Sequence, residues 1–147
     1  MTSGRIMSEQ EREQLRDFAI EAARLMRDRH CEDVTLVDVS HVSQVCQYVL
    51  IASGTSDRQM KSVADELEDL GDEHRNRCFR SSKDSALTWI VVDFIDVVAH
   101  LFEPGLRRYY DLEELWSDGE RVEWRRPEDV AADGAGDPEQ RNGADGG

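Results

Sequence analysis

Asp93 and Asp96 come closest, in type and spacing, to a catalytic pair of side chains in this sequence. A nucleotidyl-transfer site would hold two metal ions bridged by carboxylates that lie on one face of a strand. Side chains on one face of a strand lie two positions apart, whereas these aspartates lie three apart. They therefore occupy opposite faces or a turn, and no Asp-x-Asp or Asp-x-Glu in this region replaces them. The spacing argues against catalysis by this pair.

The stretch from Ser53 to Gln59 is a second place where chemistry could occur, because it joins a predicted strand to a predicted helix. Backbone donors at the start of a helix attract anions, so a nucleotide phosphate could bind there. However, the stretch has one glycine, no Walker lysine and no GxGxxG pattern, and Asp57 would repel a phosphate. These residues favour a sharp, capped turn, with weak nucleotide binding at Gly54–Asp57 as the alternative.

Other nucleophiles and metal ligands give weaker signals. No serine lies in a GxSxG pattern, and Cys31, Cys46 and Cys78 have no CxxC spacing. No disulfide framework is therefore expected, and a reducing compartment is predicted. His30 adjoins Cys31 without a second ligand pair, so neither a metal site nor a cofactor is expected. His100 lies in an apolar run and is interpreted as a hydrogen-bonded structural residue rather than a base.

Composition restricts the partners. The chain has 147 residues, which suits one domain, and its net charge of −14 argues against direct binding of DNA or other nucleic acid. A basic partner fits this charge, although solubility alone would also explain it. No stretch approaches the ~18 apolar residues that a membrane span needs, and the start lacks a signal or transit pattern. A cytoplasmic location is expected.

Hydrophobic periodicity and capping patterns predict a mixed α/β domain. Ser8 with Glu11, and Ser56 with Gln59, match the capping box at the start of a helix, and Gly71 suits a left-handed position that ends the second helix. The expected order is a helix to about residue 29, strands at 34–39 and 48–51, a helix at 56–71, a weak strand at 78–79, two strands within 89–102 joined by a turn at 93–96, and a helix at 107–116. At least one strand pairing across the second helix is expected to be parallel.

The domain is expected to span residues 9–126, between a flexible N-terminus (1–8) and a disordered tail (127–147). The tail is rich in Gly and Asp and has Val130 as its only large apolar residue, so it cannot offset the entropy cost of ordering. It has six acidic residues and one arginine, a charge of −5, which leaves −14 − (−5) = −9 on the rest of the chain. The domain itself is therefore acidic.

Aromatic and charged residues are dense between positions 89 and 116, and Tyr, Trp and Arg dominate binding hot spots. Strand alternation places Val97, Ala99 and Leu101 in the core, and Val98, His100 and Phe102 on the opposite face. In the last helix, Leu112 and Leu115 are expected to pack inward. The predicted partner-binding residues are Trp89, Asp93, Asp96, His100, Phe102, Arg107, Tyr109, Tyr110 and Trp116.

Three blocks in this order resemble the ribosomal silencing factor family, also called the Iojap-like family. They are YVLIASGTSDRQ at 48–59, WIVVD followed by DVVAHLF within 89–102, and RYYDLEELWSD at 108–118. The resemblance covers about residues 9–122. Ile95 stands where the family pattern has Gly, Gln47 replaces an acidic residue and Ala99 replaces a larger aliphatic one. Because a β-branched residue disfavours positive φ, a differently shaped turn is expected at Ile95.

The resemblance implies a fold similar to a nucleotidyltransferase-like core without the catalytic carboxylates. It also implies a non-enzymatic protein that binds the large ribosomal subunit through ribosomal protein L fourteen, blocks joining with the small subunit and so represses translation. Free members of the family often form homodimers, and organellar relatives assist maturation of the large subunit. The alternatives are a nucleotidyltransferase-like enzyme and a large-subunit assembly factor without silencing activity.

Overall fold

The computed structural model describes residues 7–86 and 88–134, and these residues fold around one mixed sheet. Its six strands have the order β3-β4-β5-β2-β1-β6. The elements along the chain are α1 (Glu9–Asp28), β1 (Glu32–Asp38), β2 (Tyr48–Ser53), α2 (Asp57–Glu73), β3 (Arg80–Lys83), β4 (Trp89–Asp93), β5 (Val97–Phe102), α3 (Pro104–Tyr110), α4 (Leu112–Leu115), β6 (Glu120–Arg121) and α5 (Pro127–Gly134). The predicted mixed α/β class is confirmed.

The strand pairings follow the sequence patterns closely. β4 and β5 form the predicted antiparallel hairpin, in which Trp89 lies opposite Phe102. β2 and β5 pair in parallel across α2, in register from Tyr48 and Val97 to Ser53 and Phe102, which confirms the expected parallel pairing. The predicted strand at 78–79 begins slightly later, at Arg80.

Both long helices begin at the predicted serines. The Oγ of Ser8 accepts a hydrogen bond from the Glu11 amide (3.1 Å), and the Glu11 carboxylate accepts one from the Ser8 amide (2.8 Å). At α2, the Oγ of Ser56 accepts from the Gln59 amide at 3.1 Å, whereas the Gln59 side chain accepts from the amide of Thr55 at 2.9 Å. These bonds satisfy amide groups that have no partner within a helix.

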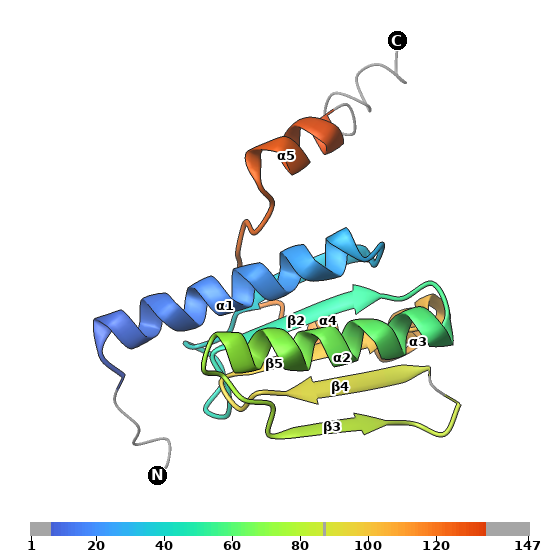
Figure 1. The fold of residues 1–147 in the computed structure, drawn as a ribbon, viewed down its shortest axis with the longest axis horizontal. Coiled ribbons are helices and arrows are strands. Elements are labelled where there is room, and N and C mark those ends of the chain that lie inside the picture. The colour runs from blue at the N-terminus through green and yellow to red at the C-terminus, as the bar shows by residue number, and fades with distance from the viewer. Residues whose placement is uncertain (1–6, 87, 135–147) are drawn as a thin grey trace.

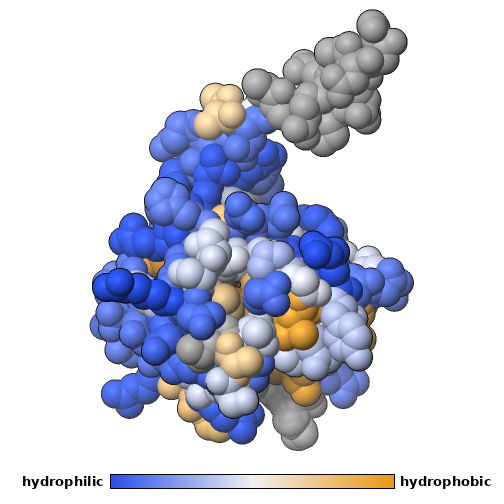
Figure 2. All heavy atoms as spheres, turned by 90° about the vertical axis from the view of Figure 1, so that its right-hand side faces the viewer, coloured by the Kyte–Doolittle hydropathy of each residue, from blue (hydrophilic) through white to orange (hydrophobic). Residues whose placement is uncertain are grey.

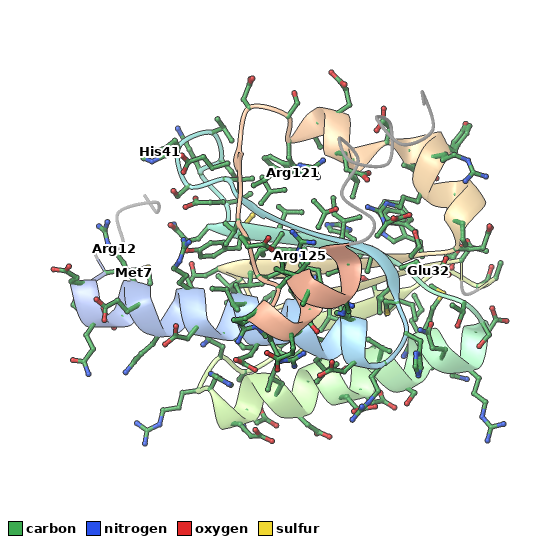
Figure 3. The ribbon with its side chains drawn as sticks, turned by 90° about the horizontal axis from the view of Figure 1, so that it is seen from above. Met7, Arg12, Glu32, His41, Arg121 and Arg125 are labelled. Atoms are coloured by element: carbon green, nitrogen blue, oxygen red, sulfur yellow. The ribbon has the colours of Figure 1, made fainter. Side chains whose placement is uncertain are left out.

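α1 and α2 cover one face of the sheet, and α3 and α4 lie on the other, as the edge-on view in Figure 3 shows. The first face is closed by side chains that include Phe18, Met26, Leu50, Leu67 and Leu101. The expected inward set of β5, Val97, Ala99 and Leu101, is buried there, so this prediction is confirmed. A second, smaller core on the opposite face consists of Val37, Val39, Cys46, Val49, Ile51 and Phe102.

Gly71 does not end α2 in the left-handed conformation that the sequence predicted. It lies inside the helix, and none of the described glycines has positive φ. A Cβ at Gly71 would come within 2.4 Å of the Asn76 carbonyl oxygen and 2.6 Å of the Phe94 ring. The glycine is therefore required by close packing, and Arg75 (φ 60°) takes the left-handed position after the helix.

Ile95 adopts positive φ, although a β-branched residue disfavours it. Its φ is 76°, and its amide donates a 2.7 Å hydrogen bond to the Asp93 carboxylate. The turn is closed by a 2.8 Å bond from the Phe94 amide to the Val97 carbonyl. The left-handed conformation costs an L-residue about 1–2 kcal/mol, so the surrounding bonds hold Ile95 in a strained state.

The boundaries expected at the two ends of the chain are wrong in part. Residues 127–134 form α5 rather than a disordered tail, and ion pairs between its aspartates and arginines hold it beside α1 (Figure 1). The low apolar content of residues 127–147 predicted disorder, whereas the contacts of this helix are ionic rather than apolar. Met7 packs against the core, so the flexible start does not reach residue 8. Residues 1–6 and 135–147 lie outside the described part of the chain. None of the described helices is long and apolar enough to cross a membrane.

Candidate functional site

An aromatic surface forms where β4, β5 and α3 meet. We define it by Trp89, His100, Tyr109 and Tyr110. The first two and Tyr110 lie against the buried ring of Phe102, and Tyr109 contacts Tyr110. The ring centre of Trp89 lies 5.0 Å from that of Phe102 and 4.8 Å from that of Tyr110. Tyr109 is 78% exposed and Tyr110 is 47% exposed. The hairpin register and the last turn of α3 therefore present aromatic rings to solvent.

The start and end of α3 place the two tyrosines. Glu103 caps the helix by accepting a 2.7 Å hydrogen bond from the Gly105 amide, and Pro104 occupies its first turn. Asp111 has left-handed geometry (φ 49°) and ends the helix directly after Tyr110. The single helix predicted over 107–116 is therefore divided into α3 and α4. A non-glycine residue rarely adopts this conformation, which is why the sequence pattern missed the break.

The Arg107 side chain contacts β1, β2 and α4 rather than the aromatic surface. Its side chain is 9% exposed, and its Nη2 lies 2.7 Å from the Glu113 carboxylate. Its Nη1 donates a 3.0 Å hydrogen bond to the Oγ of Ser53. The guanidinium thus connects α3 to α4 and β2, and its hydrogen-bonding groups face the interior rather than solvent. Phe102 is also fully buried, because α3 covers the end of β5.

His100 is neutral and hydrogen-bonded within the aromatic surface. The Trp89 Nε1–H group donates to its Nδ1 at 3.2 Å. Burial lowers the pKa of His100 from 6.5 to about 4, and the nearby charge of Asp93 opposes this shift. The middle of the surface therefore carries no positive charge at neutral pH. This arrangement agrees with the interpretation of His100 as a hydrogen-bonded structural residue.

The depressed pKa of His100 predicts a loss of stability in acid. The unfolded chain takes up a proton near pH 6.5, whereas the folded protein does so only near pH 4. The stabilisation that neutral His100 gives the folded state is therefore complete above pH 6.5. As the pH falls from 6.5 to 4 this stabilisation is lost, and the free energy of unfolding decreases by at most about 1.4 kcal/mol per pH unit. Urea unfolding at pH 7 and pH 5 should show a smaller loss for His100→Gln than for the wild type. Equal losses would contradict this account.

Asp93 and Asp96 lie at the far end of the hairpin from Trp89. The Asp93 carboxylate accepts from the Ile95 amide and lies 3.9 Å from Arg80 Nη2. The carbonyl of Asp96 accepts from the amides of Gln47 and Tyr48, which connects the turn to β2. The predicted turn is confirmed, but only Asp96 lies within it, because Asp93 is the last residue of β4 and pairs with Val98. Among the residues described, no three His, Cys, Asp or Glu side chains are grouped to hold a metal ion.

The junction before α2 has the geometry of a capped turn. The amides of Thr55 and Gln59 donate to the side chains of Gln59 and Ser56, so these two donors are not available to a phosphate. Gly54 is buried, and a Cβ there would lie 2.2 Å from Cγ of Met60. The glycine is therefore required by close packing against α2.

The other predicted residues of the last helix lie outside the residues that define the aromatic surface. Trp116 is half-buried against the second core, on the α4 side, while Leu115 is 66% exposed rather than packed inward. Leu115 lies at the end of a helix of only four residues, where a helical repeat does not predict burial. Val91 was not predicted as a partner-binding residue. It lies opposite His100 and is half-buried. Strand alternation from Trp89 would have placed it on the same face of β4 as Trp89.

Figure 2 views the molecule from the side of Figure 1 on which α3 lies. A limited group of pale and orange side chains is surrounded there by hydrophilic ones. A small, weakly polar patch with a charged rim is the usual anatomy of a protein–protein interface. The fold and this surface together define a mixed α/β protein with a candidate docking surface.

Comparison with known proteins supplies the family. Residues 11–145 match the family described as ribosomal silencing factor during starvation. A ribosomal silencing factor of Bacillus subtilis is 37% identical over 97 residues, which cover 66% of this chain and 82% of that protein. A crystal structure of a Chromobacterium violaceum protein is similar with a TM-score of 0.63 and 32% identity, covering 76% of this chain and 88% of that one. A mouse protein named mitochondrial assembly of ribosomal large subunit protein 1 is 29% identical over 96 residues, covering 63% of this chain and 42% of that protein. The chain belongs to the ribosomal silencing factor family.

Proposed function

We propose that this protein is a translation repressor that binds the large ribosomal subunit through ribosomal protein L fourteen. Bound there, it blocks joining with the small subunit by occupying space, without catalysing a reaction. Membership of the ribosomal silencing factor family supports the general role. The observation that carries the proposal in this chain is the aromatic surface on β4, β5 and α3. We further propose a cytoplasmic location and a homodimer in the free protein.

The aromatic surface has the properties that a protein partner requires. Tyr109 and Tyr110 are exposed aromatic side chains, and rigid rings of this kind contribute much of the energy at interfaces. Trp89 stacks on the core residue Phe102 and packs against Tyr110 in a tilted arrangement, which links Tyr110 to the core. A standard interface buries about 800 Å² on each partner, which a domain of this size can supply. Steric occlusion therefore needs no catalytic group.

The charge of the chain favours a basic protein surface as the direct partner. The net charge of −14 would oppose binding to exposed ribosomal RNA, whereas it would steer the protein toward a basic ribosomal protein. Salt shortens the Debye length, the distance over which exposed charges attract one another. Association with the large subunit should therefore weaken as salt rises through about 0.1–0.5 M.

Two other functions make different predictions. The name of the mouse relative favours a role in assembly of the large subunit, in which binding would leave subunit joining unchanged. The enzyme alternative has less support, because Asp93 and Asp96 lie on either side of a turn and two amides at the start of α2 are engaged by side chains. Turnover of a nucleoside triphosphate that required magnesium and stopped in Asp93→Asn would favour the enzyme.

Sedimentation with isolated ribosomal subunits tests the partner assignment. We expect the protein to sediment with large subunits and to remain in the supernatant with small subunits. Equal sedimentation with both subunits, or with neither at low salt, would contradict the proposed partner.

A further inference from the structure

Charge rather than apolar packing holds helix α5 against the domain. Asp129 is the buried residue of α5, and Val130 is 38% exposed. Arg27 of α1 lies 3.3 Å from the Asp129 carboxylate and makes two hydrogen bonds, of 2.8 and 3.1 Å, to the carboxylate of Asp133. Figure 1 shows α5 beyond α1, on the side away from α2. The helix therefore depends on α1 for its position.

Two further arginines complete the site that receives α5. Arg125 Nη1 lies 3.5 Å from the Asp133 carboxylate, and Arg126 Nη1 lies 3.2 Å from that of Asp129. Arg126 also forms a bidentate pair with Asp28 of α1, at 2.7 and 3.1 Å. We call Arg27, Arg125 and Arg126 the arginine site. It joins α1 to the segment that precedes α5.

The arginine site matches a specific feature of α5. Asp129 and Asp133 are four residues apart, so they lie on one face of a helix, one turn from each other. The guanidinium of Arg27 contacts both carboxylates. Planar arginine side chains suit paired contacts of this kind. The chemistry of the site therefore selects a helix with two carboxylates one turn apart.

α5 cannot retain its structure without these contacts. It has eight residues, and isolated helices shorter than about 12–15 residues are marginal in water. The ion-pair partners are partly exposed, with 29% for the Arg27 side chain and 37% for that of Asp133. Salt screens pairs of this kind, because the Debye length falls from about 10 Å at 0.1 M to about 3 Å at 1 M. Release from the arginine site and loss of helical structure should therefore occur together.

We propose that the arginine site is a docking site for an acidic helical segment with two carboxylates one turn apart. α5 occupies it within the same chain, and ionic strength sets its occupancy. When α5 leaves, the guanidinium groups of the arginine site lose their carboxylate partners in α5. The rest of the domain stays folded, because its two cores do not include any residue of α5.

Amide hydrogen exchange of the full-length protein tests this proposal, because it reports local opening separately from global unfolding. Exchange in residues 127–134 should be about tenfold faster at 1 M than at 0.1 M sodium chloride, while exchange in α1 stays unchanged. Asp133→Asn and Arg27→Gln should each give the faster exchange already at 0.1 M salt.

Two matched variants control for the loss of charge alone. Glu128 is an exposed acidic residue of α5 outside the arginine site, and Arg12 is an exposed arginine of α1 far from it. Glu128→Gln and Arg12→Gln should leave exchange in α5 near the wild-type rate. Slow exchange in 1 M salt and in Arg27→Gln would overturn the proposal. Rapid exchange of wild-type α5 at 0.1 M salt would also overturn it, because α5 would then not occupy the site.

Discussion

Phe102→Ala is expected to destabilise the protein by roughly 3–5 kcal/mol, the usual cost of removing a buried phenylalanine ring. Phe102 is fully buried on the face of the sheet that α3 covers. Its ring stacks with that of Trp89 at 5.0 Å. Removal leaves a cavity beneath the aromatic surface, because the strand register of β5 limits how far the backbone can move. Equilibrium urea unfolding measures the effect.

Leu115→Ala is the matched control, since this large apolar side chain is 66% exposed. Its free energy of unfolding should lie within about 0.5 kcal/mol of the wild-type value. A Phe102→Ala variant as stable as Leu115→Ala would contradict the assignment of Phe102 to the core. Any loss of ribosome binding in Phe102→Ala is expected to follow from lost stability.

Tyr110→Ala is expected to weaken binding to the large subunit by about 1–3 kcal/mol, or about 5–150-fold in affinity. Tyr110 is 47% exposed and its ring packs against Trp89 at a tilted angle, so it can contact a partner from a fixed position. Because it lies outside both cores, most of the fold remains when the ring is removed. Binding titrations with isolated large subunits, run beside urea unfolding, measure the two effects separately.

Two variants define the controls for Tyr110. Tyr110→Phe keeps the ring that packs against Trp89 and should retain most of the affinity. Val45→Ala alters a side chain that is 77% exposed in the loop before β2 and should bind as the wild type does. A Tyr110→Ala protein that is folded and binds with wild-type affinity would exclude this part of the aromatic surface from the interface.

Patterns local in the sequence predicted most of the fold. Capping residues located the starts of α1 and α2, and alternation in 89–102 gave the hairpin and the buried face of β5. These features depend on residues within a few positions of one another. The sequence therefore contains the physical cause of each in a single short stretch.

Contacts between distant segments account for the errors. Phe102 alternates with His100, but α3 folds back over the end of β5 and buries only the phenylalanine fully. Arg107 is typical of a surface by type, yet Glu113 and Ser53 satisfy it in the interior. α5 depends on Arg27, about one hundred positions away, so the composition of the tail could not reveal it. Long-range pairing of this kind requires the tertiary structure.

Subunit joining is the most direct test of the proposed silencing function. Purified large and small subunits are mixed with and without the protein, and sucrose-gradient sedimentation measures the fraction of joined ribosomes. We predict that excess protein lowers this fraction and sediments with the free large subunits, and that Tyr110→Ala does so only at higher concentration. An unchanged fraction of joined ribosomes while the protein is bound to the large subunit would contradict silencing by steric occlusion.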